Sequence, residues 1–445
     1  MIASQVEPSP PFYLNGNFAP VRDEVTAVDL AVVGEIPRAL RGVYMRNGAN
    51  PKEGDPGHWF LGDGMVHGVR LEHGKAKWYR NRLVRTRALE EGAPFLLPEG
   101  GVDYTAGKAN TNIVAHAGRV LALVENALPA EMTRALDTVG VCNFDGKLNG
   151  PMTAHPKICP RTGELHFFGY SFMEPFLVYH VLDAAGRLVR SEPIEVRGPT
   201  MMHDFAITER HVVFMDLPIV FDLERAMAGE MPYVWSDTYG ARLGIMPRGG
   251  SSADVRWLEI EPCYVFHPAN AHEADGKLVL DVARYPKLWA GDPGEFSSAA
   301  LHRWSIDIDA GTVHEAALDD RAIEFPRIDD RRAGLEHRYS YAVSGFSFGG
   351  PAGVDLVKYD TRSGAAEAHS FGPGMVPGEA VFVPASPGAE EDEGFVMTFV
   401  YAAARDGSDF VVLDARNFSG PPLARIELPQ RVPFGFHGNW IEDGV

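Results

Sequence analysis

The segment Val432-Pro433-Phe434-Gly435-Phe436-His437-Gly438-Asn439-Trp440, near the end of a chain of 445 residues, places a histidine among apolar residues and glycines. A polar imidazole in such a setting needs partners for its ring nitrogens, because burial of an unpaired polar group is costly. A metal ion is one such partner, since neutral imidazole is a common metal ligand. His437 is therefore a candidate metal ligand.

Three more histidines have comparable neighbours. They occur in Met152-Thr153-Ala154-His155-Pro156-Lys157, Met201-Met202-His203-Asp204-Phe205 and Val265-Phe266-His267-Pro268-Ala269-Asn270. The four histidines together predict an all-imidazole metal centre assembled from distant parts of one domain. We assign the other twelve mostly to turns or to the surface: His58, His67, His73, His116, His166, His180, His211, His272, His302, His314, His337 and His369.

Short β-like runs separated by turn residues recur along the whole chain. Residues 112–124 have the pattern of a hairpin with a turn at His116-Ala117-Gly118-Arg119. The clearest other strands are predicted at Leu165–Tyr170, His211–Met215, Lys277–Val282, Val354–Tyr359 and Phe395–Tyr401. Many short strands at fairly even spacing indicate a sandwich, a barrel or a propeller.

The histidine spacing favours the propeller. The chain has room for roughly seven four-stranded blades of about 45–60 residues each. The intervals between the four histidines are 48, 64 and 170 residues, near one, one and three blades. We therefore expect an all-β fold, a seven-bladed β-propeller formed as a single domain by residues 1–445, with the metal site on its axis.

Helices and hydrolase motifs are scarce. The best short helices are predicted at Leu128–Leu136 and Asp222–Met231, both within insertions. The run Gly345-Phe346-Ser347-Phe348-Gly349 matches the GxSxG pattern of serine hydrolases. That motif requires a strand, a turn and then a helix. Because Gly350-Pro351-Ala352-Gly353 and a predicted strand follow instead, a serine hydrolase is not expected.

Composition narrows the partners and the location. With 41 Lys and Arg against 60 Asp and Glu, the net charge is −19, which argues against nucleic-acid binding. The three cysteines have no CxxC spacing, no signal peptide is evident, and no apolar run reaches the about 18 residues of a membrane span. We expect a soluble cytoplasmic protein, with peripheral membrane contact possible through Phe172–Leu177 or Leu128–Leu136.

The donor types restrict the metal. Imidazole ligands suit Fe(II), Zn or Cu rather than Mg or Ca. Ligating histidines usually donate their second N–H to a carboxylate, and acidic residues in apolar strands are candidates: Glu125, Glu324 and Glu379. A rival arrangement would use Asp204 as the carboxylate of a two-histidine, one-carboxylate site, although adjacent His203 and Asp204 cannot easily reach one ion.

The segments that contain His155, His203, His267, Glu324 and His437, taken in order, resemble those of the carotenoid cleavage oxygenase family. The resemblance covers nearly the whole chain. The similarity extends to four further stretches: Leu14–Val21, Gly42–Gly48, His58–Met65 and Gly378–Pro384. The resemblance implies a seven-bladed β-propeller with Fe(II) on its axis, capped by loops and short helices that form an apolar tunnel. It also implies that His155, His203, His267 and His437 bind the iron, and that Glu125, Glu324 and Glu379 hold His203, His267 and His437 respectively.

The resemblance implies an activity as well. The expected enzyme is a dioxygenase that uses O2 to cleave a C=C bond of an apolar conjugated substrate, a carotenoid or apocarotenoid, into two carbonyl products. Cleavage of a stilbene or another phenolic alkene is the alternative, and a non-catalytic or Ca-dependent propeller is the alternative from another class. Val124 stands where stilbene-cleaving relatives place a Lys, which disfavours the stilbene; Leu61 replaces an Asp common in relatives, a change that we take as structural.

Overall fold

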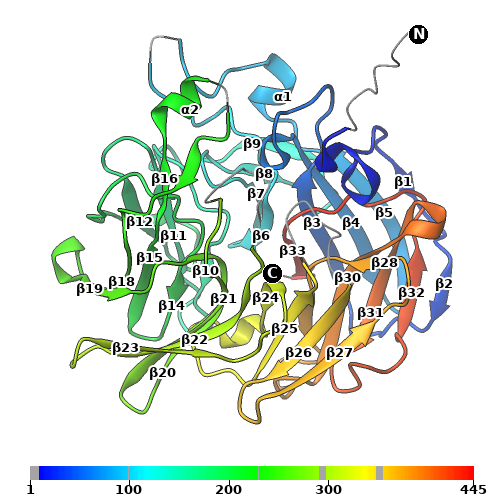
Figure 1. Ribbon diagram of the computed structural model, residues 1–445. Coiled ribbons are helices and arrows are strands. Elements are labelled where there is room, and N and C mark those ends of the chain that lie inside the picture. Colours follow the sequence, from blue (N-terminus) through cyan, green and yellow to red (C-terminus); the bar gives the residue numbers. More distant parts are fainter. Residues whose placement is uncertain (1–9, 99, 229, 290–296, 347–353, 445) are drawn as a thin grey trace, which may run out of the picture.

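The computed structural model describes residues 10–98, 100–228, 230–289, 297–346 and 354–444 (Figure 1). Within these residues, seven antiparallel sheets of four or more strands follow one another along the chain, and the fold is the predicted seven-bladed β-propeller. The first strands of neighbouring blades contact one another, as β14 contacts β20 and β20 contacts β24. These first strands therefore line the axis of the propeller.

Blades two to six each consist of strands that are consecutive in the sequence, apart from one inserted hairpin. Blade two contains β6 (Asn112–His116), β7 (Arg119–Leu123), β8 (Ala130–Met132) and β9 (Thr138–Val141). Blade three contains β10 (Lys157–Ile158), β11 (Leu165–Tyr170), β12 (Leu177–Leu182) and β13 (Leu188–Pro193). Blade four contains β14 (Ala206–Ile207), β15 (His211–Asp216), β18 (Ala241–Pro247) and β19 (Arg256–Ile260), with the hairpin β16 (Ile219–Phe221) and β17 (Tyr233–Trp235) inserted.

The next two blades repeat the pattern. Blade five contains β20 (Tyr264–Ala274), β21 (Lys277–Tyr285), β22 (Ala300–Asp307) and β23 (Thr312–Ala317). Blade six contains β24 (Ile323–Arg327), β25 (Tyr339–Ser344), β26 (Asp355–Asp360) and β27 (Ala365–Ser370). The hairpin at residues 112–124 and the five other strands expected from the sequence are all confirmed, with ends that differ by a few residues.

Blades one and seven close the ring by joining the two ends of the chain. Blade one contains β33 (Gly438–Glu442), β3 (Gly42–Ala49), β4 (Gly64–Glu72), β5 (Lys75–Leu83) and β1 (Thr26–Ala27). Blade seven contains β28 (Met375–Pro377), β29 (Val381–Pro384), β30 (Gly394–Ala402), β31 (Gly407–Asp414), β32 (Ala424–Glu427) and β2 (Val32–Gly34). Figure 1 shows the resulting contact, in which red and orange strands lie beside blue ones.

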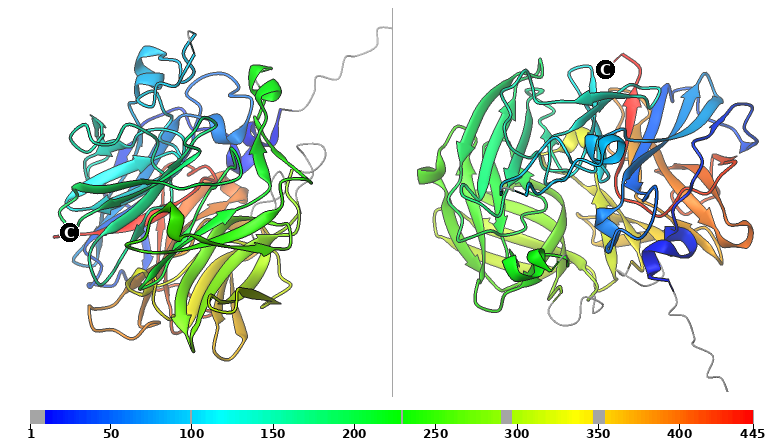
Figure 2. Two further views of the ribbon diagram at one scale, coloured as in Figure 1. Left: turned by 90° about the vertical axis from the view of Figure 1, so that its left-hand side faces the viewer. Right: turned by 90° about the horizontal axis from the view of Figure 1, so that it is seen from above.

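Two short α-helices, α1 (Arg87–Glu91) and α2 (Leu223–Met227), lie at the same end of the molecule, at the top of Figure 1. Figure 2 shows the molecule from two further directions, in which the two helices are seen apart. The expected helix at Asp222–Met231 is confirmed, although it is shorter. It begins after Asp222, whose side chain accepts a hydrogen bond from the Arg225 N–H. Residue 229 lies outside the described residues.

The helix expected at Leu128–Leu136 is wrong, because this segment contains the strand β8. Ala130 and Met132 are buried, and Glu131 pairs with Leu121 of β7, so sheet pairing overrides helix propensity. In the GxSxG run, Ser347 and its next neighbours lie outside the described residues; β26 is the next described element. Among the described residues, no helix is long and apolar enough to cross a bilayer.

Six 3-10 helices complete the described elements: Phe12–Leu14, Gly16–Phe18, Trp59–Leu61, Ser252–Asp254, Asp330–Arg332 and Ala403–Arg405.

Candidate metal centre

Four buried histidines meet on the propeller axis. One ring nitrogen of each lies within 4.8 Å of those of the other three, and the set is His155, His203, His267 and His437. His155 and His203 lie in the loops before β10 and β14, and His437 directly precedes β33. His267 lies within β20, where the pairing with β21 shifts register between Val265 and Pro268.

The backbone around His437 is fixed by blade closure. Its N–H donates to the Thr111 carbonyl at 3.1 Å, and its carbonyl accepts from the Asn47 N–H at 2.9 Å. A Cβ atom on the next residue, Gly438, would lie 2.8 Å from the Tyr44 hydroxyl oxygen. The close approach of β33 to β3 therefore requires glycine beside the histidine.

The nitrogen positions fit a bound metal ion. Nε2 of His155 and Nε2 of His203 lie 2.9 Å apart. Two ligands at right angles, each about 2.1 Å from one ion, would lie about 3.0 Å apart. The buried Nε2 of His267 has no hydrogen-bond partner. A shared cation satisfies both nitrogens of the short pair and the orphaned one, so the cluster is a buried four-histidine metal site.

Three carboxylates orient three of these rings. Nδ1 of His203 lies 2.6 Å from Glu125, Nδ1 of His267 lies 2.6 Å from Glu324, and Nδ1 of His437 lies 2.9 Å from Glu379. An Nδ1–H that donates to a carboxylate fixes the tautomer with a free lone pair on Nε2. These are the pairs expected from the resemblance, and their part in metal binding stays a prediction.

The fourth ring, His155, is held differently. Its Nδ1 lies 3.8 Å from the Asp204 carboxylate, which is beyond hydrogen-bond distance. Asp204 instead forms an ion pair with Lys157 at 2.8 Å and accepts the Phe205 N–H. Asp204 is therefore outside the nitrogen cluster, and the rival two-histidine, one-carboxylate arrangement is not found.

Every blade contributes one of these seven side chains. The four histidines come from blades three, four, five and one, and the carboxylates of Glu125, Glu324 and Glu379 come from blades two, six and seven. Glu324 lies in β24, and Glu379 lies just before β29. The site is therefore complete only when the whole ring is closed.

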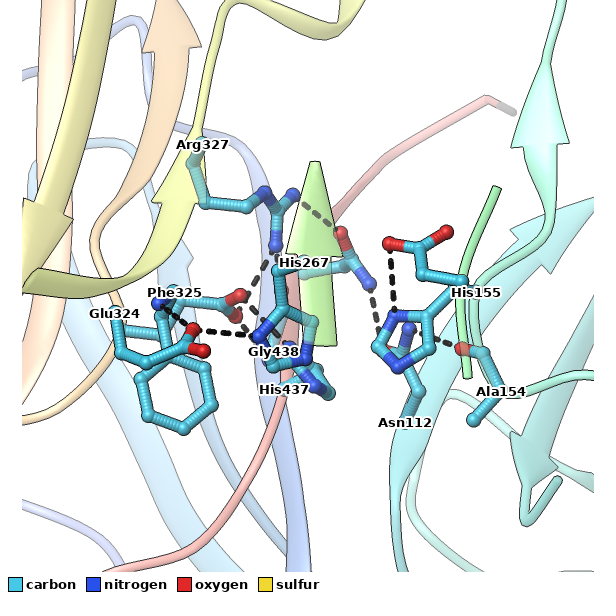
Figure 3. A network of polar contacts seen from close by, with 12 residues as sticks. Asn112, Ala154, His155, His267, Glu324, Phe325, Arg327, His437 and Gly438 are labelled. Carbon is cyan, nitrogen blue, oxygen red and sulfur yellow. Dashed lines mark hydrogen bonds and ion pairs between the residues drawn. The ribbon is translucent and has the colours of Figure 1, made fainter. Parts of the chain in front are cut away.

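The Glu379 carboxylate contacts Arg327, His437 and Gly438, which Figure 3 labels within a buried polar network. It accepts hydrogen bonds from His437 and from the Gly438 N–H, and Arg327 lies 3.1 Å away. Burial raises its pKa, but Arg327, His437 and the Gly438 N–H together lower it to about 2. Glu379 thus carries a full negative charge beside the histidines.

The Glu324 carboxylate also accepts hydrogen bonds on both of its oxygens. Its Oε2 accepts from His267 and from the Phe325 N–H at 2.6 Å, and its Oε1 accepts from the Tyr285 hydroxyl at 2.8 Å. Phe325 has φ = 54°, a left-handed conformation that costs a bulky residue free energy, and its ring stacks on His267 at 5.3 Å. This strained turn places the carboxylate and the aromatic ring on the same imidazole.

Burial keeps most of the cluster neutral. It lowers the pKa of His155, His267 and His437, and for His155 the three other histidines lower it further. For His203, burial also lowers the pKa, but the carboxylates of Glu125, Asp204 and Glu324 together raise it above its ordinary value. Neutral imidazoles are the form that binds a metal, so most of the ligands are ready to bind.

We call the end of the molecule that contains α1 and α2 the cap. An apolar cavity of about 350 Å³, the cap cavity, leads from this end to the cluster. His203, His267 and His437 form its inner end. Aromatic and aliphatic side chains form much of the rest of the wall, among them Trp59, Phe60, Phe266, Phe325, Phe436 and Val124. Such a cavity suits an apolar ligand with few polar groups.

The comparisons with known proteins agree with this geometry. The family profile described as RPE65, retinal pigment epithelial membrane protein, matches residues 18–442. A carotenoid cleavage oxygenase of Mycobacterium tuberculosis is 43% identical over 99% of this chain and 99% of that protein. The chain belongs to the carotenoid cleavage oxygenase family. A carotenoid 9,10(9',10')-cleavage dioxygenase of Pisum sativum is 34% identical over 98% of this chain and 90% of that protein.

Solved structures of the family have the same fold. A lignostilbene dioxygenase of Pseudomonas brassicacearum has a TM-score of 0.88 at 31% identity, covering 98% of this chain and 99% of that chain. A Synechocystis apocarotenoid oxygenase variant has a TM-score of 0.85 at 27% identity, covering 97% of this chain and 98% of that chain. This carotenoid cleavage oxygenase family member therefore shares its whole propeller with both.

The remaining histidines correct one expectation. Seven of those assigned mostly to turns or to the surface are buried: His67, His116, His166, His180, His272, His337 and His369. Several of them bond other polar groups, as His166 does with Tyr179 at 2.6 Å. The sequence also missed Tyr285 as a partner of Glu324, because a tyrosine at the end of an apolar strand carries no distinguishing signal.

Proposed function

We propose that this protein is an Fe(II)-dependent dioxygenase that cleaves a C=C bond of a carotenoid or apocarotenoid with O2 to give two carbonyl products. The observation that carries the proposal is the four-histidine cluster at the inner end of an apolar cavity. The carotenoid-cleaving enzymes of Mycobacterium tuberculosis and Pisum sativum, similar over 98% or more of this chain, support the substrate class.

His155, His203, His267 and His437 would hold the ion, and four neutral nitrogen donors suit Fe(II). Iron bound there supplies the activation of O2. Glu125, Glu324 and Glu379 would hold three of the rings and make their Nε2 atoms stronger donors. A calcium-dependent propeller is disfavoured, because calcium takes oxygen ligands and the cluster offers only nitrogen.

The cap cavity would bind the polyene and set which double bond reaches the cluster. Phe325, Phe266 and Phe436 lie at or beside the histidines and exclude water from that end. A fixed position of the reacting bond accounts for much of the rate enhancement in such reactions. The protein needs no side-chain nucleophile in this scheme.

Val124 favours a carotenoid over a phenolic stilbene. It lines the cap cavity directly before Glu125. A phenolate bound there would meet an apolar side chain and lose the stabilisation that a cation gives to a buried charge. Stilbene cleavage by the same centre is therefore the second candidate, supported by the similarity to the lignostilbene dioxygenase structure.

We further propose a cytoplasmic protein that touches a membrane through its cap. Large apolar side chains are exposed near the cavity: Leu96 and Leu61, which line it, and Leu223 and Met227 of α2, next to the lining residue Ala226. Of the two patches expected from the sequence, Phe172–Leu177 exposes Met173, whereas the only exposed residue of Leu128–Leu136 is Thr133. An exposed apolar patch suits extraction of a polyene from a bilayer.

The test combines metal analysis with product identification. Apoprotein is loaded anaerobically with Fe(II) and assayed in air on carotenoids, apocarotenals and hydroxystilbenes, with 18O2 and mass spectrometry of the products. We expect about one iron per chain and aldehydes that carry 18O from polyene substrates only. Absence of bound iron, or cleavage of stilbenes alone, would contradict the proposal.

A further inference from the structure

The histidine cluster separates two cavities. The cap cavity reaches His203, His267 and His437, and a second cavity of about 730 Å³ reaches His155, His267 and His437 from the other side. We call this second cavity the axial channel, because the axial strands β10, β14, β20 and β24 all contribute to its wall. A species bound at the cluster could thus arrive by either route.

The two walls differ in the number of charged and amide side chains that they contain. Aromatic rings surround the cluster on the cap side, whereas the axial channel is lined by paired charges and side-chain amides. Lys157 lies 2.8 Å from Asp204, and Arg327 lies 3.1 Å from Glu379. Asn112, Asn270 and Asn439 add polar amides to the wall. Both walls also contain apolar side chains, and Glu125 and Asn110 line the cap cavity, but the axial channel has the larger number of charged and amide groups that can contact an ion.

Carboxylates line the channel at more than one position. Asp330 on its wall is 72% exposed and lies 3.5 Å from Arg327. Asp204, which also lines the channel, is buried beside His155. Its carboxylate lies 3.8 Å from Nδ1 of that ring, which is beyond hydrogen-bond distance. Carboxylates thus occur beside the histidine cluster and at a second position on the channel wall.

We propose that the axial channel, and not the cap cavity, is the path by which the hydrated divalent ion enters and leaves the histidine cluster. Moving a hydrated ion past the aromatic rings of the cap cavity would replace little of its water, which is costly. The channel offers oxygen atoms along the way. It also stays free when an apolar substrate fills the cap cavity, so metal exchange and substrate binding use separate routes.

Two alanines provide a matched test. Ala333 lines the axial channel and Ala226 lines the cap cavity, and both are half-buried. Ala333→Cys and Ala226→Cys each add one thiol, while the native cysteines Cys142, Cys159 and Cys263 are buried. A bulky methanethiosulfonate reagent, added after folding, attaches a removable plug to either cavity without affecting folding.

The readout is metal exchange rather than turnover. Protein loaded with Co(II) is mixed with an excess of a coloured chelator, and the rate of Co(II) transfer is followed. We expect the label on Ala333→Cys to slow transfer by about tenfold or more, equivalent to about 1.4 kcal/mol of barrier, and its removal by a phosphine to restore the rate. The label on Ala226→Cys and reagent-treated wild type should keep the unlabelled rate.

A label on Ile158→Cys tests a second position on the channel wall. It is included because the label on Ala333→Cys can leave enough room for the ion to pass. Unchanged transfer with labels at both channel positions, or slowing by the Ala226→Cys label instead, would overturn the proposal. The inference rests on the metal site of the proposed function. Because Co(II) transfer needs neither iron nor O2, its failure is distinguishable from a failure of the proposed cleavage activity.

Discussion

The Glu379 carboxylate lies 2.9 Å from Nδ1 of His437, although 58 residues separate them in the sequence. Glu379 precedes β29 of blade seven and His437 precedes β33 of blade one, so the contact spans the seam where the propeller closes. A single hydrogen bond therefore couples closure of the ring to the orientation of a candidate ligand.

Replacing this carboxylate should weaken metal retention. We expect Glu379→Ala to lower the metal affinity by about 10–100-fold, because the His437 ring loses the partner that fixes its tautomer. The measurement is the metal content after dialysis against graded chelator. Glu35→Ala, at an exposed glutamate, is the control and should retain metal as wild type does. Equal retention in both variants would contradict the assigned role of Glu379.

Asp204 gives a prediction of the opposite sign. Because it pairs with Lys157 and stays outside the nitrogen cluster, Asp204→Asn should leave the metal stoichiometry unchanged. Loss of one partner of a buried ion pair should nevertheless destabilise the fold by about 3–5 kcal/mol. Metal per folded chain and the unfolding midpoint are measured together; a loss of metal without a loss of stability would instead identify Asp204 as a ligand.

The extent to which the sequence predicts this site depends on the kind of signal. Turn pairs such as Ala117-Gly118 separate the strands. Proximity to Pro or Gly is a weaker signal, because His67 and His73 also precede Gly but lie outside the cluster, whereas His203 in the cluster is next to neither. The error at Leu128–Leu136 arose because Glu131 and Met132 have ordinary helix propensity, and only pairing with β7 makes them a strand. Such long-range pairing leaves no local pattern.

The burial of polar side chains also could not be predicted from the sequence. Nothing near His337 distinguishes it from a surface histidine, and its environment is built by Asn270 and Asp281 from another blade, more than fifty residues away. The pairing of Glu324 with Tyr285 also depends on how blades five and six pack. Partners supplied by a neighbouring blade can be found only from the fold.

His337 makes the apoprotein less stable in acid. Burial, the largest effect, lowers its pKa from the usual 6.5 to about 4. The unfolded chain therefore binds a proton between pH 6.5 and 4 that the folded chain does not, so stability contributed by the neutral ring is complete above pH 6.5 and decreases as the pH falls to 4. A difference of about 2.5 pKa units corresponds to about 3 kcal/mol.

The variant His337→Gln should remove this dependence. Urea unfolding of the metal-free protein between pH 7 and 4 should show the free energy of unfolding falling less steeply in the variant than in wild type. His73→Gln, at an exposed histidine, serves as the control. Parallel curves for all three proteins would show that His337 is not held neutral by its surroundings.

Val124 should determine the type of substrate. Val124→Lys places a cation beside the inner end of the cap cavity, next to Glu125. We expect turnover of an apocarotenal to fall by about tenfold or more, because a polyene must now pack against a charge, and cleavage of a 4-hydroxystilbene to rise. Val124→Met is the apolar control of similar length. The comparison uses kcat/KM for both substrates; equal losses on both would mean that the lysine only disturbs packing.

The exposed apolar cap should affect delivery of substrate from membranes. Met227 of α2 is 81% exposed, so Met227→Lys should change the free energy of unfolding by less than about 0.5 kcal/mol. Because it places a charge where the proposed contact is apolar, it should reduce binding to neutral phosphatidylcholine vesicles and raise KM for a carotenoid dissolved in them. Val33→Lys on β2, 65% exposed on blade seven, is the control.

A second measurement uses a short apocarotenal presented without vesicles. Wild type, Met227→Lys and Val33→Lys should all cleave it equally well. An equal rise in its KM for Met227→Lys would place the defect in the cavity instead of the membrane contact.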